Sequence, residues 1–208
     1  MFNGDGRALL WIDAVGGFLV CGGDAVVLGQ AVPGNQIEIP ILADLSRQHA
    51  RICREDGYII EPVRRVCVEG HEIQGPTVLA DGDEIELGHG VRCRFRQPHA
   101  LSATARLEFV SRHRTQPAAD AVLLMAESCV LGPRWNSHVV CRPWSSEVVL
   151  YRRDGRVYCR HQDGLEIDGR FCGGEGLVTR NSRVVGADFS LSFEGVASGH
   201  PHAAAGGN

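Results

Sequence analysis

A hydroxyl, a guanidinium and an imidazole group stand close together in the stretch "ADLSRQHARI" at residues 43–52. Three kinds of chemistry use such groups: nucleophilic attack by Ser46 with His49 as base, metal binding through His49, and anion binding by Ser46 and Arg47. A fourth reading is structural, with the polar side chains tying down a loop. The residues that follow, 50–53, alternate like a strand with one buried face, so the polar groups are expected at the mouth of a strand.

Catalysis and metal binding both lack further groups that they need. A serine and histidine pair requires a third group that orients the imidazole, and no such partner can be identified. Several histidines stand alone, with no second ligand at metal-binding spacing: His49, His71, His89 and His99. The sequence therefore predicts no enzyme activity, no metal site and no cofactor.

Anion binding suits the polar stretch from Ser46 to His49 better; we call the loop that contains it the polar loop. A serine hydroxyl and a neighbouring guanidinium both donate to phosphate oxygens, and charge-assisted hydrogen bonds are roughly twice as strong as neutral ones. The planar fork of an arginine also matches phosphate geometry. We expect Ser46 and Arg47 to bind an anion, and His49 to pack against the loop and hold it.

The composition is that of an ordinary globular protein. The 208 residues are 44% hydrophobic and 22% charged, and the apolar runs are shorter than the ~18 residues that span a bilayer. The first residues do not show the basic and then apolar layout of a secretory signal, so we expect a cytoplasmic protein. All 21 basic residues are arginines interleaved with acids, and the net charge is −4, which argues against nucleic-acid binding.

Eight cysteines are scattered along the chain without a C-x-x-C pair. Most of them lie inside apolar or alternating runs such as "RICRE" and "VRCRF". We therefore expect reduced cysteines that act as small hydrophobic residues of the core.

Short strands separated by glycine turns fill the sequence. Segments such as "ALLWIDAV", "AVVLG" and "YIIEPV" are rich in Val, Ile and Leu, whereas few windows keep the apolar spacing of a helix. Strands at this spacing predict an all-β protein of the sandwich or barrel type.

The second half of the chain repeats the features of the first half in the same order. "AVVLG" ending at Gly29 has a counterpart in "SCVLG" ending at Gly132, and the Asp56-Gly57 turn has a counterpart in Asp154-Gly155. The sequence therefore predicts two tandem β-domains at 1–98 and 103–197, joined by "QPHALSA", and a flexible tail at 198–208.

The first half resembles a forkhead-associated (FHA) domain, a β-sandwich family that binds phosphothreonine. The resemblance rests on "LGQ" at 28–30, "SRQH" at 46–49, "PVRRVCVEG" at 62–70 and "LADGDEIELG" at 79–88. Gln30 stands where the family usually has an arginine, and Val63 and Arg64 stand where it has threonine and asparagine. The second half has no Ser-Arg-x-His stretch and resembles a degenerate FHA domain without phosphate recognition.

The resemblance implies a non-catalytic module that binds proteins, and it assigns residues to roles. Gly29 and His49 are expected to shape the loop, and the expected phosphopeptide-binding residues are Ser46, Arg47, Gln30, Arg64 and Arg65. Two functions stay open at this point. One is a signalling adaptor that binds phosphothreonine, and the other is a phosphate-independent scaffold or homodimer. Trp135 and Trp144 flank the shortened loop of the second half, where they either pack partly against the domain or contact a partner. Both functions have a protein as partner, and neither involves a membrane.

Overall fold

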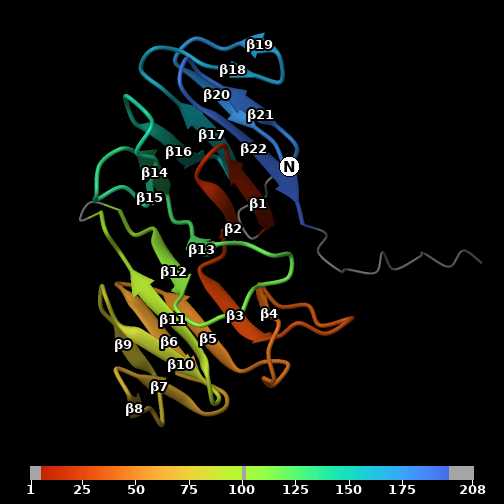
Figure 1. Ribbon diagram of the computed structural model, residues 1–208, viewed down its shortest axis with the longest axis vertical. Helices are drawn as coiled ribbons and strands as arrows, with labels where there is room; N and C mark the ends of the chain where they lie inside the picture. Colours follow the sequence, from red (N-terminus) through yellow and green to blue (C-terminus); the bar gives the residue numbers. More distant parts are fainter. Residues whose placement is uncertain (1–5, 100–101, 197–208) are drawn as a thin grey trace, which may run out of the picture.

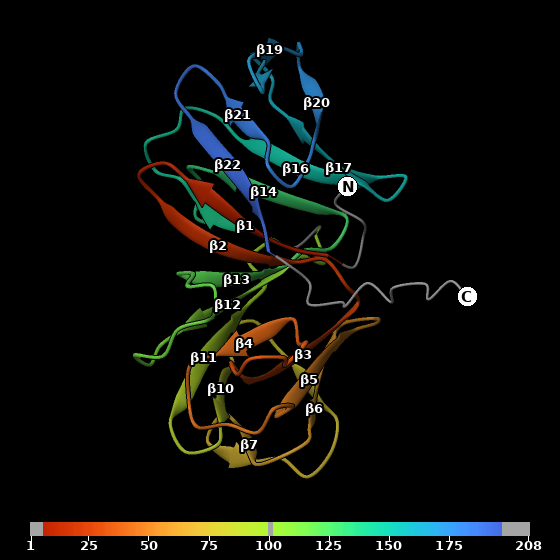
Figure 2. The ribbon, with the colours of Figure 1, turned by 90° about the vertical axis from the view of Figure 1, so that its right-hand side faces the viewer.

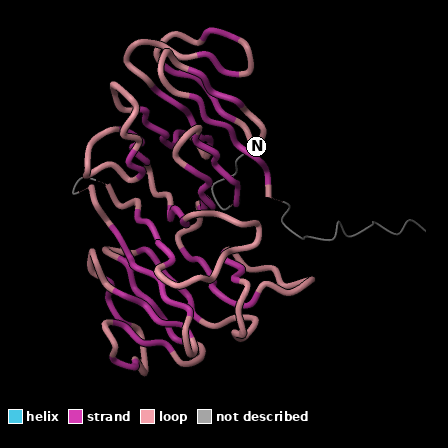
Figure 3. Tube along the Cα trace, in the orientation of Figure 1, coloured by secondary structure: helices cyan, strands magenta, loops and turns pink. Residues whose placement is uncertain are grey.

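The computed structural model describes residues 6–99 and 102–196; the tail predicted at 198–208 lies outside these ranges. Within them the chain forms strands, turns and loops, and no helix is present (Figure 3). No helix that could cross a membrane occurs in the described residues. The prediction of an all-β protein built from packed sheets is confirmed.

The largest sheet has twelve strands and runs through the whole molecule (Figure 1). Its strands, in spatial order, are β19 (Arg170–Phe171), β18 (Glu166–Ile167), β21 (Arg183–Val185), β22 (Ser190–Gly195), β1 (Arg7–Ile12), β2 (Gly16–Cys21), β13 (Ala121–Leu124), β12 (Ala105–Phe109), β11 (Val91–Arg96), β10 (Glu84–Leu87), β7 (Val66–Val68) and β8 (His71–Glu72). Neighbouring strands are antiparallel except at the centre, where β2 and β13 are parallel.

Two five-stranded sheets accompany the large one and have the same internal order. The first contains β4 (Ile39–Ile41), β3 (Ala25–Gln30), β5 (Ala50–Arg54), β6 (Tyr58–Pro62) and β9 (Thr77–Leu79). The second contains β15 (Val139–Val140), β14 (Ser128–Gly132), β16 (Val148–Arg153), β17 (Arg156–Arg160) and β20 (Glu175–Val178). In both sheets the short first strand is parallel to its neighbour and the other pairs are antiparallel.

Two hydrophobic cores lie against the large sheet. Core one joins its strands β10 to β13 to the first five-stranded sheet, and core two joins β1, β2 and β22 to the second. Strand β1 contributes Leu9 to core one and Leu10 to core two, because successive side chains of a strand point to opposite faces. The central strands β1, β2 and β13 are thus almost continuously buried and covered on both faces.

Strand pairing crosses the boundary that the sequence predicted between 1–98 and 103–197. The hairpin β1–β2 pairs with β22 from the C-terminal half, and β11 pairs with β12 from that half. Figure 2 shows the red β1–β2 hairpin beside the blue β22, while the green β12 lies beside β11. The two hairpins have similar apolar patterns, so the sequence alone does not specify which half each one covers.

Candidate anion-binding site

The polar loop at residues 44–49 is held in place by His49. The backbone N–H of Ser46 donates to His49 Nδ1 at 3.3 Å, and His49 Nε2 donates to the carbonyl of Arg65 at 2.9 Å. The carbonyl of His49 accepts the N–H groups of Val63 and Arg64, both at 3.0 Å. His49 therefore links this loop to the 63–65 loop.

These contacts require a neutral imidazole that accepts at Nδ1 and donates at Nε2. Burial lowers the pKa of His49, because the charged form would lose hydration, and the nearby Arg64 charge lowers it further. The bond to the Arg65 carbonyl acts in the opposite direction, since it would also stabilise the protonated ring. The uncharged form that the loop needs is favoured at neutral pH.

Gly29 allows β3 to pass directly beneath the polar loop. A Cβ atom at this position would lie 2.1 Å from the Arg47 carbonyl oxygen and 2.9 Å from that of Ser46. Next to it, the N–H of Gln30 donates to the Ser46 carbonyl at 2.9 Å, and the N–H of His49 donates to the Leu28 carbonyl at 2.8 Å. The close approach explains why a residue without a side chain ends the "AVVLG" run.

Three predicted ligands expose polar groups around this loop. Ser46 is half-buried, whereas Arg47 and Arg64 are exposed. Among the described residues, no carboxylate lies within ion-pair distance of either arginine. Both guanidinium groups are therefore available to an anionic ligand.

Arg65 differs from Arg64 although the sequence presents the two as equivalent. Its guanidinium pairs with Glu86 at 2.9 Å and with Glu72 at 3.4 Å, and it also donates to the Gly88 carbonyl. The hydrogen bond to Glu86 raises the pKa of Arg65. Since two carboxylates balance its charge, Arg65 braces the 63–65 loop, whereas Arg64 in the same loop has no carboxylate partner among the described residues.

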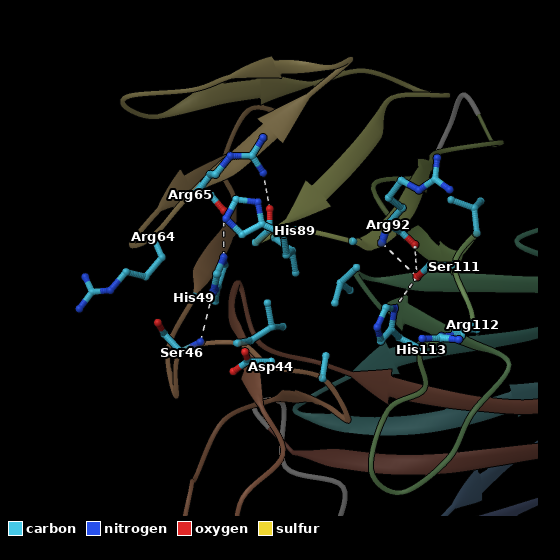
Figure 4. A pocket seen from close by; sticks show the side chains of 17 residues that line it. Asp44, Ser46, His49, Arg64, Arg65, His89, Arg92, Ser111, Arg112 and His113 are labelled. Carbon is cyan, nitrogen blue, oxygen red and sulfur yellow. Dashed lines mark hydrogen bonds between the residues drawn. The ribbon is translucent and has the colours of Figure 1, made fainter.

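A cavity of about 950 Å³ opens beside the polar loop. Ser46, His49, Arg64 and Arg65 form one side of it, whereas Gln30 and Arg47 lie outside its lining. The opposite side is formed by residues that the sequence analysis did not single out: Arg92, Ser111, Arg112 and His113 (Figure 4). We call these four residues the second wall. Three of them, Ser111, Arg112 and His113, belong to the polar run "SRHR" at 111–114.

The second wall is positioned by the pairing of β12 with β11. The N–H groups of Val110 and Ser111 donate to the Arg92 carbonyl at 3.0 and 3.3 Å, and Ser111 Oγ accepts the Arg92 N–H at 3.1 Å. On the other side of the loop, the N–H of Leu42 donates to the Arg114 carbonyl at 2.8 Å. The loop after β12 is thus fixed at both of its edges.

The corresponding loop of the second half has different chemistry. Ser146 Oγ lies 2.7 Å from His161 Nε2, and His161 Nδ1 lies 3.1 Å from the Gly164 carbonyl oxygen, so this histidine also links two loops. However, the side-chain methylenes of Glu147 lie against Gly132, and its carboxylate pairs with Arg134 at 3.5 Å. A carboxylate at this place repels an anionic ligand.

The two tryptophans near that loop have separate environments. Trp144 is buried and packs against Phe189 with ring centroids 5.2 Å apart. Trp135 has 84% of its surface exposed, beside Arg142 and Pro143. Trp144 is therefore a core residue, and only Trp135 is free to contact a partner.

The fold and the site define a class of protein. It is an all-β protein whose loops between strands present exposed arginines, Arg47 and Arg64, around a hydrogen-bonded serine and histidine. The family model described as FHA domain matches residues 26–88, from β3 to the end of β10. No curated protein matches the chain. FHA domains are non-catalytic modules that bind phosphopeptides in protein partners. The match contains the polar loop and covers well under half of the chain, without the hairpins β1–β2 and β12–β13.

Proposed function

We propose that this chain is a phosphothreonine-dependent signalling adaptor, and that its polar loop binds the phosphothreonine of a protein partner. The observation that supports this proposal is a loop fixed by His49 that exposes Ser46, Arg47 and Arg64 without carboxylate partners among the described residues. A cytoplasmic location, where kinases supply the modification, is part of the proposal.

The physical basis is the dianionic charge of the phosphate and its acceptor oxygens. The Ser46 hydroxyl and the two guanidinium groups are all donors, and those of the arginines are charge-assisted. Because His49 and Gln30 hold the loop through hydrogen bonds, little conformational entropy is lost when the peptide binds. In this proposal Gln30 and Arg65 support the site, and Arg64 takes the place of the polar residues that FHA domains have in this loop.

In this proposal, the loop of the second half that corresponds to the polar loop does not bind phosphate. Its loop carries the Glu147 carboxylate where the first half has His49 before the next strand. The second half then acts as a structural partner, because its β12–β13 hairpin completes the sheet of the first half.

Binding of an oriented phosphothreonine peptide library tests the proposal. We expect Arg47→Ala and Arg64→Ala each to weaken binding about tenfold or more, since hydrogen bonds to charged groups contribute about 1.5–3 kcal/mol. Arg51→Ala is the matched control, because this exposed arginine lies on β5 outside the cavity and pairs with Glu61. Equal binding of phosphorylated and unphosphorylated peptides would disprove phosphate dependence.

A phosphate-independent scaffold is the second candidate, and the exposure of Trp135 favours it. Large aromatic side chains and arginines are enriched among the residues that dominate protein interfaces. Under this alternative, the Trp135→Ala variant loses a partner, or a dimer detected by light scattering, and phosphatase treatment changes nothing. Retention of all partners by Trp135→Ala would reject the scaffold.

A further inference from the structure

The cavity beside the polar loop has cationic groups on both sides. Figure 4 shows Ser46, His49, Arg64 and Arg65 on one side, and the second wall on the other. The proposed phosphothreonine site uses only the first side. The second wall comes from β11 and from the loop after β12, which belongs to the C-terminal half of the chain.

The charges of the lining are unequally neutralised. Of its four arginines, Arg65 pairs with Glu86 and Arg92 pairs with Glu84 at 3.5 Å. In the ranges that the structure describes, Arg64 and Arg112 have no carboxylate within ion-pair distance. Each side of the cavity therefore offers one guanidinium whose charge no carboxylate of the described residues balances; that of Arg64 also donates to the Val63 carbonyl at 3.0 Å.

Within residues 6–99 and 102–196, the one carboxylate that lines the same cavity is that of the exposed Asp44. The lining thus has a surplus of positive charge, although the whole chain has a net charge of −4. A local surplus in an acidic protein favours a ligand with more than one negative group, because charge complementarity gives specificity.

The second wall is also rigid enough to select a ligand. Ser111 Oγ contacts the backbone of Arg92 and lies 2.9 Å from His113 Nδ1. The loop ends in the bridge between Thr115 and Ile41 of β4. Arg112 is therefore held by a backbone that is fixed before the ligand arrives, which lowers the entropic cost of binding.

We infer that Arg112, with His113 beside it, binds a second anionic group of the same partner peptide. The inference rests on the proposed function and adds a requirement to it: the partner segment carries a phosphothreonine at the polar loop and a carboxylate or a second phosphate at the second wall. One donor is the guanidinium of Arg112. The other is the Nε2 atom of His113, which carries a proton when Nδ1 accepts the Ser111 hydroxyl and which has no hydrogen-bond partner among the described residues.

Peptide binding to the full chain tests this inference. Four kinds of fluorescent peptide are compared. The first carries a single phosphothreonine, and the second adds a glutamate that is moved one position at a time along the peptide. The third has a second phosphothreonine at the best of these positions, and the fourth has the glutamate but no phosphate. The second anion is expected to raise affinity about fivefold, as an exposed ion pair can provide. Comparing the affinity gained from the glutamate with that gained from the second phosphothreonine shows which anion the second wall prefers.

Two variants separate the second wall from the phosphothreonine site. Arg112→Ala should abolish the gain from the second anion and leave the affinity for the single phosphothreonine unchanged, whereas Arg64→Ala should weaken every phosphorylated peptide. Arg114→Ala is the matched control, since this arginine lies in the same exposed loop and outside the cavity. It should behave as the wild type does.

Each outcome bears on a different claim. If the single phosphothreonine binds and no second anion adds affinity, or if the gain persists in Arg112→Ala, the inference is overturned and the proposed function stands. If no phosphorylated peptide binds at all, both are overturned.

Discussion

Phe95 on β11 lies opposite Leu107 on β12 in the large sheet. In the same way, Phe193 on β22 lies opposite Leu10 on β1. Both phenylalanines are buried, and the strand that pairs with each belongs to a hairpin from the other half of the chain. Each half therefore supplies two strands to the sheet of the other half, which joins the halves through both cores.

This exchange predicts where the chain can be divided. A fragment of residues 24–125 contains every strand from β3 to β13, and these strands form the first five-stranded sheet and its half of the large sheet. We expect this fragment to unfold cooperatively. The fragment 1–98 lacks β12 and β13, so β11 loses its paired neighbour and core one loses Leu107 and Val122; we expect this fragment to be largely unfolded. Circular dichroism during urea denaturation distinguishes the two.

The full chain provides a control for this prediction. Leu107 is 1% exposed, and Leu107→Ala should lower the free energy of unfolding of the whole protein by about 2–5 kcal/mol, the usual cost of such a cavity. A cooperative transition in 1–98 together with none in 24–125 would show that the hairpins return to their own halves when the chain is cut.

The sequence predicted the strands and the polar loop because both depend on local signals. Alternating apolar residues, glycine turns and the "SRQH" stretch are short-range patterns, and they placed Ser46 and His49 correctly next to β5. The exchange of hairpins depends on a choice between two similar surfaces far apart in the chain, which no local pattern contains.

The same limit applies to the site. Arg64 and Arg65 are adjacent and chemically identical, and their different roles come from Glu86 and Glu72 on other strands. Arg112 reaches the cavity only because β12 pairs with β11. The spacing of residues in the sequence predicts neither the pairing of Arg65 with these carboxylates nor the position of Arg112 at the cavity.

Replacement of Gly29 should damage the polar loop selectively. A Cβ atom there would lie 2.1 Å from the Arg47 carbonyl oxygen, so Gly29→Ala must push the loop away from β3. We expect a loss of about 1–3 kcal/mol in unfolding free energy, as for other overpacked sites, and weaker phosphopeptide binding. Gly57→Ala is the control, since nothing lies within 4 Å of its added Cβ. Similar unfolding curves for both variants would contradict the close approach of Gly29.

The buried His138 predicts a loss of stability in mild acid. Its Nδ1 accepts the Val130 N–H at 2.8 Å, and its ring stacks on His99. Burial, together with the neighbouring His99 and Arg106 charges, lowers the pKa of His138 from 6.5 to about 4. Between these pH values the unfolded chain binds a proton that the folded chain does not, so the stability present above pH 6.5 is lost as the pH falls toward 4.

The expected loss from His138 is about 3 kcal/mol over that range. Urea denaturation at a series of pH values measures it, and His138→Gln, which cannot take up the proton, removes this contribution while the carboxylates still titrate. His49 acts in the same direction, because its pKa is also lowered, so some dependence should remain in the variant. Identical pH profiles for the wild type and His138→Gln would refute the prediction.

The cysteines predict a simple pattern of chemical labelling. Seven of the eight are buried, and only Cys172 is partly exposed. Burial raises the pKa of Cys21, Cys93, Cys129, Cys141 and Cys159 to about 12, which suppresses the thiolate that reacts with thiol reagents. We expect one fast adduct by mass spectrometry in the native protein, none in Cys172→Ser, and labelling of every thiol in denaturant. Rapid native labelling of Cys172→Ser would mean that a core thiol reaches solvent without unfolding.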